Sequence, residues 1–173
     1  ADAVILGAGG AGTALSWCLV ERADRPASIV VTDTSDERLA HLRDVHRRHG
    51  TPESLIRYVN VSEPGAGNAV IADAARASLI VNATGLGKDR PGSPLADDAV
   101  LPLGAYVWEF NYRGTLEFLA QARAQAEARE LTVVDGWRYF IHGWTQVISE
   151  VFSVEMPPAR VEELATIAEF ARA

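Results

Sequence analysis

Short apolar runs alternate with segments of helical periodicity along almost the whole chain. The apolar runs predict strands near residues 3–6, 28–33, 56–61, 78–82, 105–109 and 131–134. The other segments predict helices near residues 10–22, 36–49, 65–75, 114–129, 137–152 and 158–172. Strands that alternate with helices form a parallel sheet, because each crossover returns the chain to the same end of the sheet. The pattern therefore predicts an α/β fold with a doubly wound parallel sheet of about six strands and helices on both faces.

The first predicted strand leads into a glycine-rich turn that opens the first helix. Its residues are Gly7, Ala8, Gly9, Gly10, Ala11 and Gly12. In this spacing Gly7 allows a tight turn, Gly9 leaves room for a pyrophosphate, and Gly12 lets the helix pack closely on the strand. Backbone N–H groups and the helix dipole then favour bound phosphates. The turn predicts a Rossmann-type dinucleotide-binding domain, with a purely structural strand-to-helix turn as the alternative.

Asp33 ends the second predicted strand, where dinucleotide-binding sheets place an acid beside the adenosine ribose. A carboxylate at this position accepts hydrogen bonds from the ribose hydroxyls and repels a 2′-phosphate. The sequence therefore predicts NAD as the cofactor. Asp33 could instead cap the turn that continues through Thr34 and Ser35, and the two roles are compatible.

Composition excludes several classes of function. A chain of 173 residues is long enough for one domain with a normal core. Its formal net charge of −7 argues against a nucleic-acid partner, since such partners require clustered Lys and Arg. No apolar run has membrane-spanning length, and no signal-peptide pattern is present. The single cysteine, Cys18, predicts a small core residue and a reducing compartment. We therefore expect a cytoplasmic protein without a membrane partner.

Two groups of charged residues invite a functional interpretation. Lys88 is the only lysine and is followed by Asp89 on the Gly- and Pro-rich loop 85–98, which we predict to be a cofactor-side or lid loop. Adjacent loop residues rarely converge on one atom, so they predict a solvated ion pair and not a local acid–base pair. His46 and His49 lie on an arginine-rich helix without a third ligand nearby, which predicts a polar helix face and no metal site.

Five segments in the order of the chain resemble the shikimate/quinate dehydrogenase family. They are Gly7-Ala8-Gly9-Gly10-Ala11, Asn82-Ala83-Thr84, Ser93-Pro94-Leu95, Glu109-x-x-Tyr112 and Asp135-Gly136. The resemblance covers nearly the whole chain and implies the C-terminal NAD(P)-binding domain. In this family an N-terminal substrate domain comes first and contributes a Lys/Asp pair that moves the hydroxyl proton. Residues 1–173 are therefore expected to be one dinucleotide-binding domain taken from a two-domain enzyme, with no catalytic residue of its own.

The resemblance also implies the roles of individual residues. Cofactor contacts fall on Gly7, Ala8, Gly9, Gly10, Ala11, Asp33, Thr34, Asn82, Ala83, Thr84, Phe110 and Gly136. Asp33 replaces the arginine with which the family binds the 2′-phosphate of NADP, which again implies NAD. Tyr112 would reach the substrate carboxylate. The family's glutamine for substrate hydroxyls falls on Gly143, which places the identity of the substrate in question.

Together these features predict an NAD-dependent dehydrogenase. It would transfer a hydride between NAD and the ring hydroxyl of a cyclic hydroxy acid, such as shikimate or quinate, and serve aromatic amino acid biosynthesis. Its partners would be that small molecule and the N-terminal domain. One alternative is a non-catalytic ligand-sensing or regulatory module that keeps the fold, as the replacement at Gly143 suggests. A second alternative is another two-domain NAD(P) oxidoreductase, such as a methylenetetrahydrofolate dehydrogenase.

Overall fold

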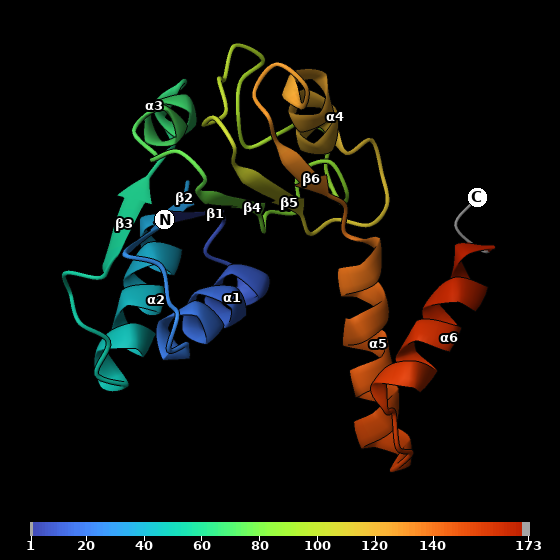
Figure 1. Cartoon of the computed structure of the whole chain (residues 1–173). Helices are drawn as coiled ribbons and strands as arrows, with labels where there is room; N and C mark the ends of the chain where they lie inside the picture. Colours follow the sequence, from blue (N-terminus) through green and yellow to red (C-terminus); the bar gives the residue numbers. More distant parts are fainter. Residues whose placement is uncertain (1, 171–173) are drawn as a thin grey trace.

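The computed structural model describes residues 2–170, which fold into a sheet covered by helices (Figure 1). The strands are β1 (Asp2–Leu6), β2 (Ser28–Asp33), β3 (Ile56–Asn60), β4 (Leu79–Asn82), β5 (Tyr106–Glu109) and β6 (Thr132–Val134). The helices are α1 (Gly10–Glu21), α2 (Asp36–Arg48), α3 (Ala66–Ala72), α4 (Glu117–Gln125), α5 (Trp137–Phe152) and α6 (Pro158–Glu169). Every predicted element is present. The predicted end of the last helix, residues 171 and 172, lies outside the described residues.

The strands form one parallel sheet in the order β3-β2-β1-β4-β5-β6. Within it, Leu6 of β1 lies opposite Thr32 on one side and Asn82 on the other. The chain thus starts in the middle of the sheet, builds outward to β3, and then crosses back to build the other half. This arrangement confirms the predicted Rossmann-type doubly wound fold. The strand order reverses between β1 and β4, which is where such sheets bind ligands.

Two hydrophobic cores flank the sheet. Val4 and Leu6 of β1 contribute to the core on the side of α3 and α4, whereas Ala3 and Ile5 contribute to the core that includes Leu42 of α2. Figure 1 shows α1 and α2 on one face and α3 and α4 on the other. Because helices cover both faces, β1 is apolar at consecutive positions and does not alternate with polar residues.

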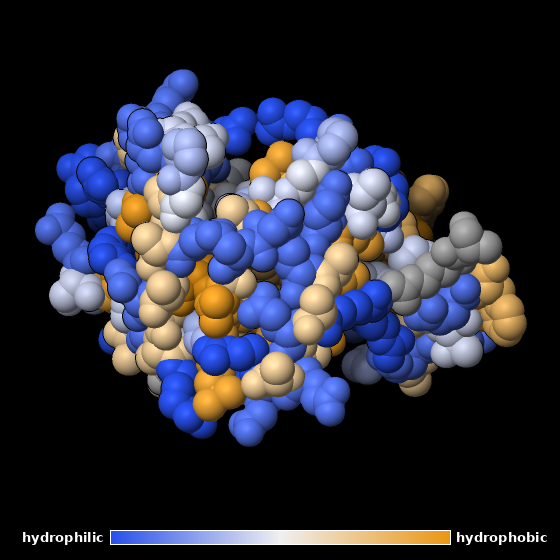
Figure 2. Space-filling model, turned by 90° about the horizontal axis from the view of Figure 1, so that it is seen from above, coloured by the Kyte–Doolittle hydropathy of each residue, from blue (hydrophilic) through white to orange (hydrophobic). Residues whose placement is uncertain are grey.

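Helices α5 and α6 form a hairpin that extends from the β6 edge of the sheet (Figure 1). They pack on each other through Trp137, Ile141, Val161 and Ala165. Several large apolar side chains of the hairpin are exposed, namely Trp144, Val147, Ile148, Val151, Phe152, Val154, Ile167 and Phe170. Figure 2, which views the molecule from the side of α3 and α4, shows hydrophilic and apolar residues side by side on that face. The exposed apolar side chains of the hairpin are not covered by other residues of the described chain.

Two side chains differ from the sequence prediction. Cys18 is exposed on α1, so it is not a core residue. His46 is 1% exposed and does not belong to the polar face of α2. The reason is helical spacing, since His46 follows Leu39 and Leu42 by seven and four residues and shares their buried side. His49 is exposed, as predicted. Among residues 2–170, no helix combines the length and apolar character needed to cross a membrane.

Candidate functional site

The glycine-rich turn between β1 and α1 contains glycines of two kinds. Gly7 has a φ of +108°, and a Cβ on Gly12 would lie 1.9 Å from the carbonyl oxygen of Gly7. These two glycines are therefore required by the turn and by the close approach of α1 to β1. A Cβ on Gly9 or Gly10 would meet nothing within 4 Å. Packing within the protein does not explain these two glycines, and the space beside them is open to a ligand.

The N-terminus of α1 presents backbone N–H groups toward that open space. The first helical N–H with an acceptor is that of Thr13, which donates to the carbonyl of Gly9 at 2.9 Å. The N-cap residue is Gly9, which has no side chain that could accept from these N–H groups. The N–H groups of Gly10, Ala11 and Gly12 therefore have no acceptor within the described part of the chain. Together with the helix dipole, they favour an anionic group at this point.

Asp33 lies at the end of β2 beside the glycine turn. Its Oδ2 accepts a hydrogen bond from the N–H of Ala8 at 2.8 Å, and its Oδ1 accepts one from the N–H of Ser35 at 2.9 Å. The contact with Ser35 is the capping role that the sequence predicted. Each oxygen still has a second lone pair for a ligand hydroxyl. Sequence reasoning missed Arg38, whose Nη1 lies 3.7 Å from Oδ1 and whose side chain is 62% exposed.

A cavity of about 470 Å³ lies beyond the carboxyl ends of β1, β2 and β4, and we call it the β2-side cavity. The predicted site residues that line it are Gly7, Gly9, Asp33, Thr34, Ala83 and Thr84. Ser93, Pro94 and Leu95, the third segment of the resemblance, line it as well. Arg38 and Arg90 add positive charge to its wall. Gly7 and Gly9 of the glycine turn thus share one cavity with Asp33 and Thr34.

A second cavity of about 450 Å³, the β5-side cavity, adjoins the first at Ala83, Thr84 and Gly85. The predicted residues that line it are Ala11, Phe110, Tyr112 and Gly143, together with Ala83 and Thr84. Aromatic side chains of α5 complete its wall. The two cavities therefore extend along the carboxyl edge of the sheet from β2 to β5. Such an elongated site suits a dinucleotide and a second ligand at the β5 end.

Four of the predicted cofactor residues lie outside these two cavities. Ala8 and Gly10 line a groove of about 650 Å³ between α1 and α2, which Gly9 also lines. Asn82 is fully buried beneath the junction of the two cavities. Gly136 is buried as well, and a Cβ there would lie 2.3 Å from the carbonyl oxygen of Asn111. Gly136 thus permits close packing of the chain after β6 on the corner after β5.

The ends of β4 and β5 are joined by a fully buried carboxyl group, Glu109. Its Oε2 accepts a hydrogen bond from Nδ2 of Asn82 at 2.9 Å, and its Oε1 accepts one from the N–H of Asn111 at 2.8 Å. Oδ1 of Asn82 in turn accepts from the N–H and the Oγ1 of Thr84. Burial raises the pKa of Glu109 to about 7, although these hydrogen bonds favour the ionised form. Sequence reasoning missed this role, for which the only signal was an acid ending an apolar strand.

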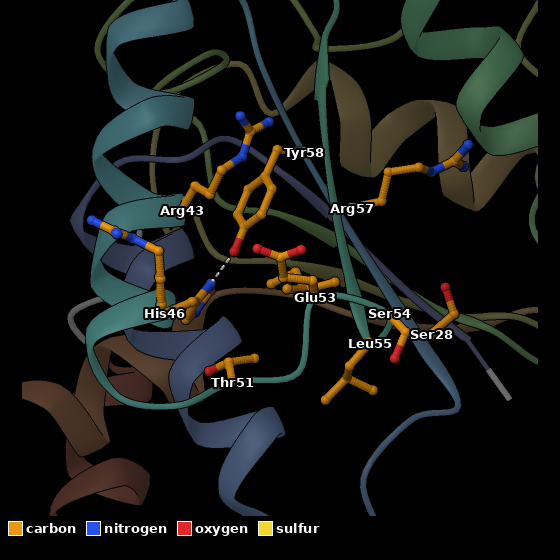
Figure 3. Close-up of a pocket in the computed structure, with 11 residues that line it drawn as sticks. Ser28, Arg43, His46, Thr51, Glu53, Ser54, Leu55, Arg57 and Tyr58 are labelled. Carbon is orange, nitrogen blue, oxygen red and sulfur yellow. Dashed lines mark hydrogen bonds between the residues drawn. The ribbon is translucent and has the colours of Figure 1, made fainter.

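A further cavity of about 640 Å³ lies at the β3 edge of the sheet (Figure 3). Beside it, Nδ1 of His46 lies 2.7 Å from the hydroxyl of Tyr58, and Nε2 lies 3.2 Å from Oγ of Ser16. Ser16 is fully buried, so this arrangement cannot serve a nucleophile. The cavity is also lined by Ser28 and Ile56, the first residues of β2 and β3. It therefore lies near the amino ends of these strands, away from the edge where such sheets bind ligands.

No protein-family model and no curated protein sequence matches the chain. Solved structures do share its fold. The shikimate 5-dehydrogenase of Thermus thermophilus, in complex with shikimate, is 23% identical with a TM-score of 0.61, over 96% of this chain and 53% of its own. That of Listeria monocytogenes, in complex with shikimate and NAD, is 18% identical with a TM-score of 0.63, over 94% and 55%.

Shikimate dehydrogenase 1 of Peptoclostridium difficile is 15% identical with a TM-score of 0.66, over 99% of this chain and 54% of its own. The chain thus spans about half the length of the solved structures that it matches. At these identities the likeness concerns the backbone and not individual side chains. The chain has the fold that makes up about half of each of these shikimate dehydrogenase structures, as the resemblance in its sequence predicted.

Proposed function

We propose that this chain is the NAD-binding domain of a two-domain dehydrogenase. The reaction would be hydride transfer between NAD and the ring hydroxyl of a cyclic hydroxy acid of the shikimate or quinate type. One observation supports the proposal more strongly than the others. The N–H groups of Gly10, Ala11 and Gly12 have no acceptor among the described residues, and they lie beside the carboxylate of Asp33 and the cavities along the carboxyl edge of the sheet.

Each part of the site has a distinct task in this proposal. The amides of the glycine turn bind the pyrophosphate, and the adenosine half occupies the β2-side cavity, where Asp33 accepts hydrogen bonds from the ribose. The nicotinamide half passes Ala83 and Thr84 into the β5-side cavity and lies against Phe110. NAD, when bound, supplies the hydride acceptor. The chain contributes orientation and the exclusion of water, which bring the reacting atoms into near-attack geometry.

The choice of NAD over NADP depends on two opposing charges. The carboxylate of Asp33 repels a 2′-phosphate, whereas the guanidinium of Arg38, 3.7 Å from Asp33, attracts one. Arg38 is largely solvated, so its attraction is screened more strongly than the repulsion from the buried carboxylate. We therefore expect NAD to bind more tightly than NADP by about tenfold, which corresponds to about 1.4 kcal/mol.

The proposal includes a second domain that contacts the α5–α6 hairpin. In the solved structures about half of each chain lies outside the part matched here. Trp144, Val147, Ile148 and Val151 follow one another at helical spacing on α5 and are all exposed. A stripe of this kind marks a surface that another protein element covers. The second domain would carry the Lys/Asp pair that the family resemblance implies.

Calorimetric titration of the chain with NAD, NADP, ADP-ribose and ADP tests the cofactor assignment. We expect saturable binding of NAD, competition by ADP-ribose, and weaker binding of NADP. The exposed variant Asp24→Asn, remote from the glycine turn, serves as the matched control for altered charge. Failure of every nicotinamide nucleotide to bind would contradict the proposal.

A second assay tests the reaction in a longer protein that includes the remaining domain. Shikimate and quinate are supplied with NAD, and reduced nicotinamide is followed by its absorbance. We expect hydride transfer with at least one of the two acids. If NAD binds but no hydride is transferred to or from any cyclic hydroxy acid, the ligand-sensing module becomes the better interpretation, which the absence of a side chain at Gly143 favours.

A further inference from the structure

Lys88 lies in the β5-side cavity beside Tyr112. Its Nζ is 5.9 Å from the centroid of the Tyr112 ring, and its side chain is only 26% exposed. Asp89 lies 3.3 Å from this Nζ but also 3.4 Å from Nη2 of Arg113, and its own side chain is 54% exposed. The predicted ion pair is therefore present, with Asp89 exposed and Lys88 partly buried. One carboxylate faces two cations, which leaves a net positive charge beside Tyr112.

The position of Lys88 is set by backbone contacts of its loop. The N–H of Asp89 donates to the carbonyl of Gly85 at 2.9 Å, which closes a turn around Lys88. The N–H of Leu116 donates to the carbonyl of Gly87 at 3.1 Å, which ties the same turn to the start of α4. The Lys88 side chain is thus anchored at its base within the cavity. A fixed cation of this kind suits the recognition of a carboxylate.

Aromatic rings form the wall of the β5-side cavity. Tyr112 and Phe140 are stacked with ring centroids 4.0 Å apart, and Phe110 and Tyr139 are stacked at 4.1 Å. Trp144 meets Phe140 edge to face at 6.3 Å. Aromatic surfaces of this type bind the apolar faces of planar or unsaturated rings.

The polar side chains of the same cavity include Tyr112 and Tyr139 as well as Thr84 and Asn111. Oγ1 of Thr84 already donates to Asn82, and Nδ2 of Asn111 donates to the carbonyl of Leu86. Gly143 contributes no side chain, and a Cβ there would meet nothing within 4 Å, so open space remains on this side of α5. This space leaves room for a substrate ring beside the aromatic wall.

We propose that Lys88 anchors the carboxylate of the substrate, and that the substrate ring lies against the wall formed by Tyr112, Phe140 and Trp144. This inference rests on the proposed function, because the nicotinamide enters the same cavity. It adds to the proposed function the residue of this chain that binds the substrate carboxylate. Lys88 acts here as a binding and specificity-determining residue.

The test uses three small probes on the complex of the chain with NAD, followed by tryptophan fluorescence. Benzoate is a planar ring acid, benzamide is its uncharged analogue, and shikimate is a polyhydroxylated ring acid. We expect benzoate to bind about tenfold more tightly than benzamide, as a charge-assisted hydrogen bond implies, and we expect shikimate to bind as well. Equal binding of benzoate and benzamide would overturn the inference.

Substitutions test whether Lys88 is the cation that binds the carboxylate of benzoate. Lys88→Met should reduce benzoate binding to the level of benzamide and leave benzamide unchanged, whereas Lys88→Arg should retain most of it. Arg113→Met is the matched control, because Arg113 faces the same carboxylate of Asp89. Loss of benzoate binding in Arg113→Met but not in Lys88→Met would overturn the assignment to Lys88.

A measurement without mutation covers the case in which a variant fails to fold. Lys88 is the only lysine, so acetic anhydride labels one side-chain amine, and mass spectrometry follows the rate. Benzoate should slow this acetylation several-fold more than benzamide does, and equal rates would contradict the proposal. NAD binding is titrated separately. Loss of NAD binding contradicts the proposed function, whereas intact NAD binding without the benzoate preference contradicts only this inference.

Discussion

The backbone N–H of Ala8 donates a 2.8 Å hydrogen bond to Oδ2 of Asp33, so one carboxylate holds the glycine turn against the end of β2 and also lines the β2-side cavity. The residue that we expect to select the cofactor therefore also supports the glycine turn. Substitutions at Asp33 combine a structural and a ligand-binding effect. The two effects separate when stability and affinity are both measured.

Asp33→Asn tests both roles. Each carboxylate oxygen accepts from a backbone N–H, so either orientation of an amide places a donor against a donor. We expect a loss of about 1–3 kcal/mol in the free energy of unfolding, measured with urea. We also expect weaker NAD binding and a smaller preference for NAD over NADP in calorimetric titrations. Asp24→Asn is the exposed control, and an unchanged preference in Asp33→Asn would contradict the ribose role.

Gly9→Ala and Gly12→Ala should have opposite consequences. A Cβ at Gly12 would lie 1.9 Å from the Gly7 carbonyl, so this variant should lose roughly 2–4 kcal/mol of stability. A Cβ at Gly9 would meet nothing within 4 Å, so this variant should fold normally but bind NAD at least about tenfold more weakly, through steric contact with the pyrophosphate. Urea unfolding and titration with NAD measure the two effects. Unchanged NAD affinity in a folded Gly9→Ala protein would show that the turn serves packing alone.

Glu109 should make the free energy of unfolding depend on pH, in a direction that follows from its raised pKa. Burial raises its pKa from the usual 4.5 to about 7, so the folded protein keeps a proton that the unfolded chain releases. Stability should therefore fall as the pH rises from 4.5 to 7, by at most about 3 kcal/mol from this group. Below that window Glu109 is protonated in both the folded and the unfolded state, so it adds no pH dependence to the stability.

Glu109→Gln should abolish this pH-dependent contribution. The variant should also be less stable at pH 4.5 by about 1–3 kcal/mol, because its amide faces the Nδ2 donor of Asn82. Urea unfolding across the pH range compares it with the native protein and with Glu127→Gln, a control at an exposed acid. A pH profile identical to that of the native protein would contradict the assignment of the raised pKa to Glu109.

Tyr58→Phe tests whether the cavity at the β3 edge of the sheet is separate from the proposed cofactor site. The substitution removes the hydroxyl that lies 2.7 Å from Nδ1 of His46, so a buried ring nitrogen loses its partner. We expect a loss of about 1–2 kcal/mol of stability by urea unfolding and an unchanged affinity for NAD. A marked change in NAD affinity would place the ligand at the β3 edge instead.

The double substitution Val151→Ser and Phe152→Ser tests the exposed face of the hairpin. These side chains are 68% and 70% exposed, so the isolated chain should unfold with the same free energy to within about 0.5 kcal/mol. In a longer protein with the second domain, the same change should separate the unfolding transitions of the two domains in calorimetry. Ile141→Ser, in the core between α5 and α6, is the control that should destabilise both proteins.

Local sequence patterns are sufficient to predict the strands, the helices and the glycine turn. Consecutive apolar residues in β1 predict a strand buried on both faces, and the spacing of Gly7 and Gly12 predicts the close packing that the structure shows. These features depend on residues near one another in the chain. For the same reason the capping contact from Asp33 to Ser35 can be predicted.

Contacts between distant segments cannot be predicted in this way. The spacing of His46 from Leu42 places it on the buried side of α2, but its partners Tyr58 and Ser16 come from other elements. The raised pKa of Glu109 depends on the burial of its carboxyl group beneath the junction of the two cavities. The sequence predicts a solvated Lys88, because it does not show that the loop folds against the aromatic wall of α5.

The close approach of Gly12 to the carbonyl of Gly7 leaves little freedom for the main chain of the turn. The nucleotide binding that we propose would therefore not require a loop to become ordered. A preorganised anion cradle avoids that entropic cost. Stopped-flow mixing with NAD is therefore expected to show one concentration-dependent phase, without a slower isomerisation after the encounter.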